Sequence, residues 1–520
     1  MEETGIGEGP RQGPDTDPGA LRDRGLHPGS HGDPGSLRDR GLHPGWDMDP
    51  EEFRASGYRA IDWIAGFLAR PEDWRVLPRV EPGEIVRGLP DRLPVEGEPF
   101  DRILADFQRL IPQATTHWNH PGFMAYFATT GSGPGILGEL LCAALNSQAM
   151  LWRTGPAATE LEQVTTGWLL RLLGLPPDWD GTINDTASTS TLYALAAARE
   201  FASDLQIREL GLAGRLDLPP LRVYCSEEAH SSVDKAVLTL GLGRVGLRKI
   251  PTDHDLRMNP RALEAAIVED LAAGVRPLAV VATVGTTSTT AVDPVPVIAD
   301  ICEAEGLWLH VDAAYGGVAA ALPEMRALLA GCERADSLVV NPHKWLFVPM
   351  DCSVLYSRRP DVLKRAFSLV PEYLTTPESG RVKNLMDYGV ALGRRFRSLK
   401  LWFVLRYFGE VGIQAALREH LALAQRLGEW VDDDARFERL APIRFSVVLF
   451  RAHPAGLVDE GELERLNASI LDRVNSSGEI FISHTKVRGR YALRVAIGNL
   501  RTRLEHVRRA WDLIREAAGA

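Results

Sequence analysis

The sequence predicts an α/β protein with a mostly parallel central sheet, followed by a smaller α+β domain at its C-terminal end. Two observations favour this class. Through the middle of the chain, short and nearly continuous apolar runs alternate with helical patterns, as strands buried on both faces of a parallel sheet do. The last part of the chain carries a separate set of two strand patterns between helices.

The N-terminal quarter is predicted to be a tail followed by helices. Residues 1–45 contain LRDRGLHPG twice and are rich in Gly, Pro, Arg and Asp, so we predict a disordered low-complexity tail. The histidines of the repeat leave metal binding as the less favoured alternative, because no second ligand stands at helical spacing. Residues 46–131 are predicted to be a helical segment, with helices from Met48 to Ala69 and from Asp101 to Leu110.

The next two predicted domains are residues 132–395, a large α/β domain, and residues 396–520, a small α+β domain. In the first, a helix from Pro134 to Leu145 precedes the strands LRVYC, VGLRKI, PLAVVATV, LWLHV and SLVV. The segment from Gly393 to Gly409 has the pattern of one long helix. The strands IRFSVVLFRA and YALRVAIG and three helices complete the chain.

Composition restricts the classes of function. The chain has 520 residues, 45% of them apolar and 24% charged, as in a globular protein. The net charge of −11 argues against a nucleic-acid partner. No apolar run reaches the roughly 20 residues of a membrane helix, and the start MEETG lacks a signal-peptide core. Five scattered cysteines without a CxxC pair are typical of reduced thiols. We therefore predict a cytoplasmic protein with no membrane partner and no metal site.

Polar side chains follow several of the predicted strands. They are His230, Thr286, Thr287, Asp312, Asn341, His343 and Lys344. Ligands bind beyond the C-terminal ends of the strands in an open parallel sheet, so these residues are candidates for a site. For each residue alone, a structural hydrogen bond at a strand end is the more common explanation.

A phosphate site is suggested by NDTASTSTLYALAAARE, from Asn184 to Glu200. Its hydroxyl groups and the free N–H groups of a helix start favour an anion, although simple N-capping explains the same residues. The chain has no GxxxxGK[ST] motif, so a nucleotide P-loop is not supported. A lysine, a carboxylate and a phosphate cradle together are what pyridoxal 5'-phosphate (PLP) requires.

These motifs resemble one family. HVDAAYGG, NPHKW and AHSSVDKA, with THWNHPGFMAYF, PEYL and GRRFRSLKLWF, are similar to those of the PLP-dependent group II amino-acid decarboxylases, most nearly the aromatic-L-amino-acid decarboxylases. The resemblance extends from about Met48 to the C-terminus. It implies the fold type I, aspartate-aminotransferase-like architecture of PLP-dependent transferases. It also implies a homodimer that the N-terminal helical segment embraces and whose active site lies at the interface.

The resemblance also implies roles for individual residues. Lys344 is the Schiff-base lysine, Asp312 pairs with the pyridine nitrogen, and His230 stacks on the cofactor ring. The remaining cofactor positions are Ala187, Ser188, Asn341, His343 and Thr287, and those that meet the substrate are Thr129, Trp118, Tyr126, Phe127, Gln148, Met150 and Gly393. For the three aromatic residues, a place in the core is the less favoured alternative.

The resemblance implies that Tyr373, in PEYL, determines whether the product is an amine or an aldehyde. A phenol there supplies the proton that completes amine formation, whereas relatives with phenylalanine favour an oxidative route to the aldehyde. The chain has both Tyr373 and His230, so we predict decarboxylation of an aromatic L-amino acid to the amine and CO₂. Gly393 resembles the small residue of family members that admit an indole ring, which favours tryptophan-like or broad aromatic substrates over tyrosine alone. The alternatives are an aromatic aldehyde synthase, a decarboxylase of a non-aromatic amino acid such as glutamate, and a non-catalytic scaffold.

Overall fold

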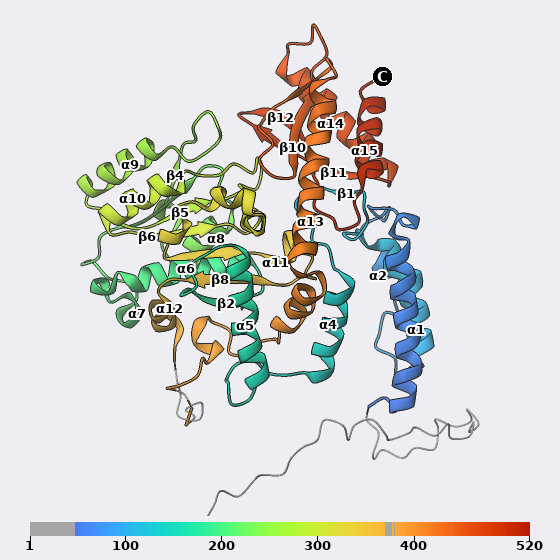
Figure 1. Cartoon of the computed structure of the whole chain (residues 1–520), viewed down its shortest axis with the longest axis horizontal. Helices are drawn as coiled ribbons and strands as arrows, with labels where there is room; N and C mark the ends of the chain where they lie inside the picture. The colour runs from blue at the N-terminus through green and yellow to red at the C-terminus, as the bar shows by residue number, and fades with distance from the viewer. Residues whose placement is uncertain (1–46, 370–376, 379, 520) are drawn as a thin grey trace, which may run out of the picture. The chain divides into compact units, whose positions relative to one another are not determined.

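The structure is a computed structural model and describes residues 47–369, 377–378 and 380–519 (Figure 1). Contacts within the chain divide it at Ile61/Asp62 into two units. Helix α1 (Pro50–Ala69) crosses this division. The predicted tail lies outside the described residues, and the predicted domain limits at residues 131 and 395 stay predictions.

A seven-stranded sheet forms the centre of the larger unit, in the order β2-β8-β7-β6-β5-β3-β4. Its strands are β2 (Asp180–Asn184), β3 (Leu221–Ser226), β4 (Leu247–Ile250), β5 (Arg276–Thr283), β6 (Trp308–Asp312), β7 (Ser337–Val340) and β8 (Ser353–Ser357). Strands β3 to β7 pair in parallel, and β8 is antiparallel to both of its neighbours. It follows that β2 runs in the same direction as β7. The predicted α/β class, with a mostly parallel sheet, is confirmed.

Both faces of this sheet are covered by helices. Along β5, Ala279 and Val281 pack in one apolar cluster with α6 (Ala187–Phe201), α8 (Ser232–Thr239) and α12 (Pro360–Phe367). Their neighbours Val280 and Ala282 pack in the opposite cluster, with α5 (Pro156–Leu172), α9 (Pro260–Ala272) and α10 (Val295–Glu305). Successive strand residues point to opposite faces, so a strand covered on both sides must be apolar throughout.

A second, five-stranded sheet has the order β1-β11-β12-β10-β9. Its strands are β1 (Phe123–Met124), β9 (Phe437–Arg439), β10 (Val447–Ala452), β11 (Phe481–Val487) and β12 (Arg490–Ala496). Helices α14 (Glu460–Ser477) and α15 (Leu504–Ala517) pack on it in one apolar cluster. The long helix α13 (Ser398–Asp432) contacts α4 and α5 as well as β9 and β10. It therefore connects the two sheets (Figure 1).

The remaining helices are α2 (Glu84–Gly88), α3 (Phe100–Leu110), α4 (Gly133–Leu145), α7 (Ile207–Leu210) and α11 (Pro342–Trp345). Side chains cap three of the longer helices: Thr186 for α6, Asn259 for α9 and Asp459 for α14. Each accepts a hydrogen bond from an N–H group that the first turn leaves without a partner. Among the described residues, no helix combines the length and apolar character needed to cross a membrane.

The helix predicted from Gly393 to Gly409 differs in the structure. Helix α13 begins at Ser398, because the backbone of Arg394 is bonded elsewhere. Its N–H donates to Gln148 Oε1 at 2.9 Å, and its carbonyl accepts the N–H of Ala149 at 2.9 Å. Gly409 has a non-helical backbone (φ 59°), and the helix resumes after this kink.

Candidate active site

The candidate site lies at the edge where the parallel strands of the seven-stranded sheet end. Strands β3, β5, β6 and β7 have their C-terminal ends there, and β2 ends at the same edge because it runs in the direction of β7. Asp312 is the last residue of β6, in register with Thr283 on one side and Val339 on the other. The sheet therefore gathers residues far apart in the sequence along one line.

Lys344 is on α11, the short helix that follows β7. Its side chain is partly buried, and its Nζ lies 5.1 Å from the centroid of the Phe127 ring. Burial lowers the pKa of Lys344, the charge of Asp312 opposes this effect, and the charge of Arg494 adds to it. Since only the neutral amine is a nucleophile, these surroundings favour the nucleophilic form of Lys344.

Asp312 and His230 share the electrostatic environment of Lys344. Asp312 is buried, and its Oδ1 accepts the N–H of Ala314 at 3.1 Å. The His230 ring is fixed by Ser232, whose N–H donates to His230 Nδ1 at 3.1 Å. Burial of part of the ring lowers the pKa of His230, Asp312 raises it, and Lys344 lowers it. The lysine, the carboxylate and the imidazole therefore act on one another, as one site requires.

The start of α6 provides an anion cradle at the same edge. Among the described residues, the backbone N–H groups of Ala187 and Ser188 have no protein acceptor. Asn341, which follows β7, is buried, and its Nδ2, the donor end of the amide, lies 3.3 Å from His343 Nε2. His343 Nδ1 accepts the N–H of Cys352 at 2.9 Å, and burial lowers the pKa of His343 to about 4. Free donors at a helix N-terminus are what a phosphate group requires.

Arg494, on β12, was missed by the sequence analysis. Its guanidinium carbon lies 4.7 Å from the centroid of the Phe127 ring. The buried side chain donates to the carbonyls of Tyr126, Thr287 (3.0 Å) and Ser288 (3.1 Å). Burial lowers the pKa of Arg494 to about 10. The only signal in the sequence was a lone arginine within the apolar run YALRVAIG.

The three aromatic candidates lie in two environments. Trp118 and Tyr126 are 36% and 55% exposed and stack on one another at 6.0 Å between centroids. Phe127 is buried and stacks on Tyr315 at 3.9 Å. It therefore belongs to the core while its ring contacts Lys344. Thr129 is partly buried, and the Thr287 side chain is exposed while its carbonyl binds Arg494.

Gln148 and Gly393 lie next to each other, and Met150 contacts a different residue. A Cβ atom on Gly393 would lie 3.4 Å from Gln148 Nε2. The carbonyl of Met150 accepts the N–H of Met386 at 3.1 Å. No hydrogen bond or ring contact of the described residues joins these three directly to Lys344. Tyr373 lies outside the described residues.

The fold and the site define a PLP-dependent enzyme of fold type I. The chain matches the pyridoxal-dependent decarboxylase conserved domain over residues 82–453. It is 40% identical to the aromatic-L-amino-acid decarboxylase of Catharanthus roseus, over 89% of this chain and 93% of that protein. It is 39% identical to the phenylacetaldehyde synthase of Petunia hybrida, over 90% of this chain and 94% of that protein. The protein belongs to the pyridoxal-dependent decarboxylase family and is a carboxy-lyase.

A solved structure gives the same result. The crystal structure of Catharanthus roseus tryptophan decarboxylase in complex with L-tryptophan superposes with a TM-score of 0.84 at 39% identity. The superposition covers 91% of this chain and 99% of that one. PLP is the cofactor of the family, and the residues of this chain fit it. A buried carboxylate, a lysine of lowered pKa and free N–H groups at a helix start are all present.

Proposed function

We propose that the protein converts an aromatic L-amino acid into the corresponding amine and CO₂. The observation that carries the proposal is the group of Lys344, Asp312 and His230 at the strand ends, in which Lys344 lies beside the Phe127 ring. The similarity to an aromatic-L-amino-acid decarboxylase and to a tryptophan decarboxylase supports the aromatic substrate class. When bound, PLP withdraws electrons from the Cα–carboxylate bond of the substrate.

The chain's own residues would hold the cofactor and move protons. Lys344 would bind its aldehyde carbon, and Asp312 would keep the pyridine nitrogen protonated by placing a negative charge against it. The N–H groups of Ala187 and Ser188 would hold the phosphate together with Asn341. His230 would lie on the ring face, and Tyr373 would deliver the proton to Cα.

An acidic substrate is less well supported. A decarboxylase of glutamate needs a free cationic group for the side-chain carboxylate. Arg494 is a buried cation at this site, but each of its three nitrogen atoms is bonded to a backbone carbonyl. Recruiting it for an acidic side chain would break bonds that hold the Tyr126 and Thr287 backbone. Because the hydrogen bonds of Arg494 are already made to the backbone, the site favours a substrate with a neutral aromatic side chain.

An aldehyde-forming enzyme is the second candidate function. The similarity to a phenylacetaldehyde synthase supports it to the same extent as the similarity to decarboxylases. The presence of Tyr373 and His230 favours the amine. The deciding experiment is incubation of the holoenzyme with tryptophan, tyrosine, phenylalanine and DOPA, with CO₂, amine, aldehyde and hydrogen peroxide measured together. Amine equal to CO₂ supports the proposal, and aldehyde with peroxide equal to CO₂ overturns it.

The proposal includes a homodimer. Four leucines of α4 are 47–64% exposed: Leu137, Leu140, Leu141 and Leu145. Leu137 also lines a pocket of about 670 Å³, together with residues of α13 that include Trp402, Phe403 and Tyr407. Exposed apolar side chains grouped on one helix favour a protein partner, and a second copy would cover them. Leu145→Asp should lower the dimer fraction in sedimentation experiments, whereas the exposed Leu216→Asp should not. A monomeric wild-type holoenzyme would overturn this part of the proposal.

A further inference from the structure

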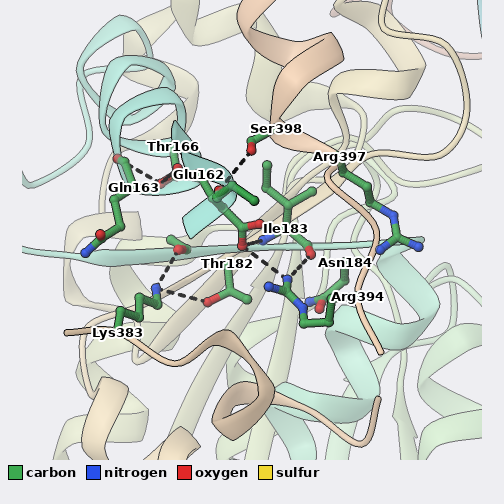
Figure 2. Close-up of polar contacts among 12 residues, drawn as sticks. Glu162, Gln163, Thr166, Thr182, Ile183, Asn184, Lys383, Arg394, Arg397 and Ser398 are labelled. Atoms are coloured by element: carbon green, nitrogen blue, oxygen red, sulfur yellow. Dashed lines mark hydrogen bonds and ion pairs between the residues drawn. The ribbon is translucent and has the colours of Figure 1, made fainter. Parts of the chain in front are cut away.

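Strand β2 has one edge without a strand partner, since it pairs only with β8 among the described strands. The backbone groups on this edge are instead bonded by charged side chains (Figure 2). The N–H of Ile183 donates to Glu162 Oε1 at 2.9 Å, and the carbonyl of Ile183 accepts a hydrogen bond from Arg394 Nη2 at 2.5 Å. Lys383 Nζ donates to the carbonyl of Gly181 at 2.8 Å.

Glu162 and Arg394 also bind each other. Arg394 Nη2 lies 3.1 Å from Glu162 Oε1, and the two side chains are 7% and 2% exposed, respectively. Arg394 Nη1 is buried without a hydrogen-bond partner among the described residues. Burying two charges costs free energy that apolar side chains of similar size would not cost. A gain in stability is therefore a poor explanation for this ion pair. Its hydrogen bonds to neighbouring backbone groups, which hold those groups in place, explain it better.

One end of the pair fixes the start of the anion cradle. Ile183 is bonded through both its N–H and its carbonyl, and it precedes Thr186, the cap of α6, by three residues. Asn184, the next residue, donates to Ser190 Oγ inside α6 at 3.1 Å. The position of the Ala187 and Ser188 N–H groups is thus tied to the position of the Glu162 carboxylate.

Arg394, at the other end of the ion pair, fixes the position of Gln148 beside Gly393. The backbone of Arg394 binds Gln148 Oε1 through its N–H and the N–H of Ala149 through its carbonyl. Because Gln148 Oε1 accepts this bond, the amide nitrogen is the end that remains available. That nitrogen lies beside Gly393, within 3.4 Å of where a Cβ would be.

We propose that Glu162 and Arg394 form a positioning clamp on the free edge of β2. The clamp holds the anion cradle and the Gln148–Gly393 pair at fixed positions relative to each other. A substitution in the clamp should therefore alter cofactor affinity and substrate preference together. Arg394 is a positioning residue. This inference rests on the proposed function for its substrate side only, because cofactor binding can be measured without turnover.

The test compares Arg394→Met and Glu162→Gln with Arg451→Met. Arg451 is a matched control because it is also a buried arginine with carboxylate partners, Glu438 and Glu460, but it is on β10 in the other sheet. The dissociation constant of PLP is measured by absorbance titration of the apoenzyme, and the ³¹P signal of the bound phosphate by NMR. The ratio of kcat/KM for tryptophan to that for tyrosine is the third readout, and the melting temperature is the fourth.

We expect Arg394→Met to weaken PLP binding about tenfold, since small displacements of positioned groups have effects of this size or larger. It should also shift the ³¹P signal and change the substrate ratio. Glu162→Gln, which keeps an acceptor for Ile183, should have a smaller effect in the same direction. Arg451→Met should lower only the melting temperature. If Arg394→Met does not fold, Glu162→Gln and Arg394→Lys are judged by the same readouts.

Two results would overturn the clamp. One is an unchanged PLP dissociation constant and ³¹P signal in the variants of both residues, with only the melting temperature lowered. The other is an equal loss of cofactor affinity in Arg451→Met. A wild-type enzyme that binds PLP but forms no amine from any aromatic amino acid would overturn the proposed function instead. The cofactor readouts would then still decide on the clamp.

Discussion

Lys344 Nζ lies against the ring of Phe127, 5.1 Å from its centroid. The same ring carries the guanidinium of Arg494 at 4.7 Å. Two cations beside one ring repel each other, and Arg494 thereby lowers the pKa of Lys344 in addition to the larger effect of burial. A residue of β12, in the five-stranded sheet, therefore lowers the pKa of a lysine that follows β7, in the seven-stranded sheet.

Arg494→Met should raise the pKa of Lys344, because it removes a positive charge. At a given pH, less of the lysine will then be neutral, so PLP will attach to the apoenzyme more slowly. The measurement is the rate of cofactor attachment against pH, followed by absorbance. The midpoint should move to higher pH in Arg494→Met and stay near that of the wild type in Arg494→Lys. Coincident profiles of wild type and Arg494→Met would contradict this account.

Lys344→Ala should abolish covalent attachment of the cofactor and lower turnover by about 10³-fold or more. The lysine supplies the only amine proposed to bind the aldehyde carbon, whereas the proposed anion cradle at Ala187 and Ser188 is left intact. Borohydride reduction followed by peptide mapping should label residue 344 in the wild type and no residue in the variant. A label on another lysine of the wild type would refute the assignment of Lys344.

The positions of the strand-end residues could be predicted from the sequence, and the reason is geometric. Asp312 ends one apolar strand and Asn341 directly follows another, and parallel strands end at one edge. The place of Arg494 at the site could not be predicted, because its side chain binds the carbonyl of Tyr126, which is 368 residues away in the sequence. That contact depends on packing between distant segments. Nothing in the local pattern of YALRVAIG specifies that contact.

Strand β2 was missed for a different reason. Its sequence, DGTIN, contains residues that are depleted in strands. It forms a strand because β8 pairs with one edge and Glu162, Arg394 and Lys383 bond the other. The early start predicted for α13 was wrong for the same reason, since the Arg394 backbone binds Gln148 and Ala149 instead of continuing the helix. Tertiary partners decided the local structure in both cases.

Tyr373→Phe should divert product from the amine toward the aldehyde, because the phenol is the proposed donor of the proton to Cα. Amine and aldehyde are quantified by chromatography, and hydrogen peroxide is measured in the same reaction. Tyr491→Phe is the control, since Tyr491 is on β12 in the five-stranded sheet and has no proposed role in the reaction or the dimer. An unchanged ratio of amine to CO₂ in Tyr373→Phe would remove this residue as the proton donor.

Gly393→Ser should disfavour tryptophan relative to tyrosine by about tenfold, since loss of fit in a pocket is worth a factor of this order. The new side chain would occupy the space beside Gln148 Nε2, where a Cβ already approaches to 3.4 Å. The measurement is kcat/KM for both amino acids. The matched control is Gly97→Ser, at an exposed glycine whose Cβ would meet nothing within 4 Å. Equal losses for the two substrates would contradict a role of Gly393 in specificity.

Acidification should destabilise the protein through its buried histidines. Burial lowers the pKa of His120, His310, His343 and His420 to about 4, from an ordinary value of 6.5. Between these values the unfolded chain binds protons that the folded protein does not bind, so stability is present above pH 6.5 and is lost as the pH falls toward 4. Each histidine should cost about 2 kcal/mol between about pH 7 and about pH 5.

Denaturant unfolding of the holoenzyme at about pH 7 and about pH 5 measures this loss. His420 is the best single test, because its ring is buried and bonded to Trp345 Nε1 and to the carbonyl of Asn499. His420→Gln should be less stable near neutral pH, since it disturbs these bonds, but it should lose about 2 kcal/mol less than the wild type on acidification. A variant that keeps the full pH dependence of the wild type would show that His420 is not one of the groups responsible.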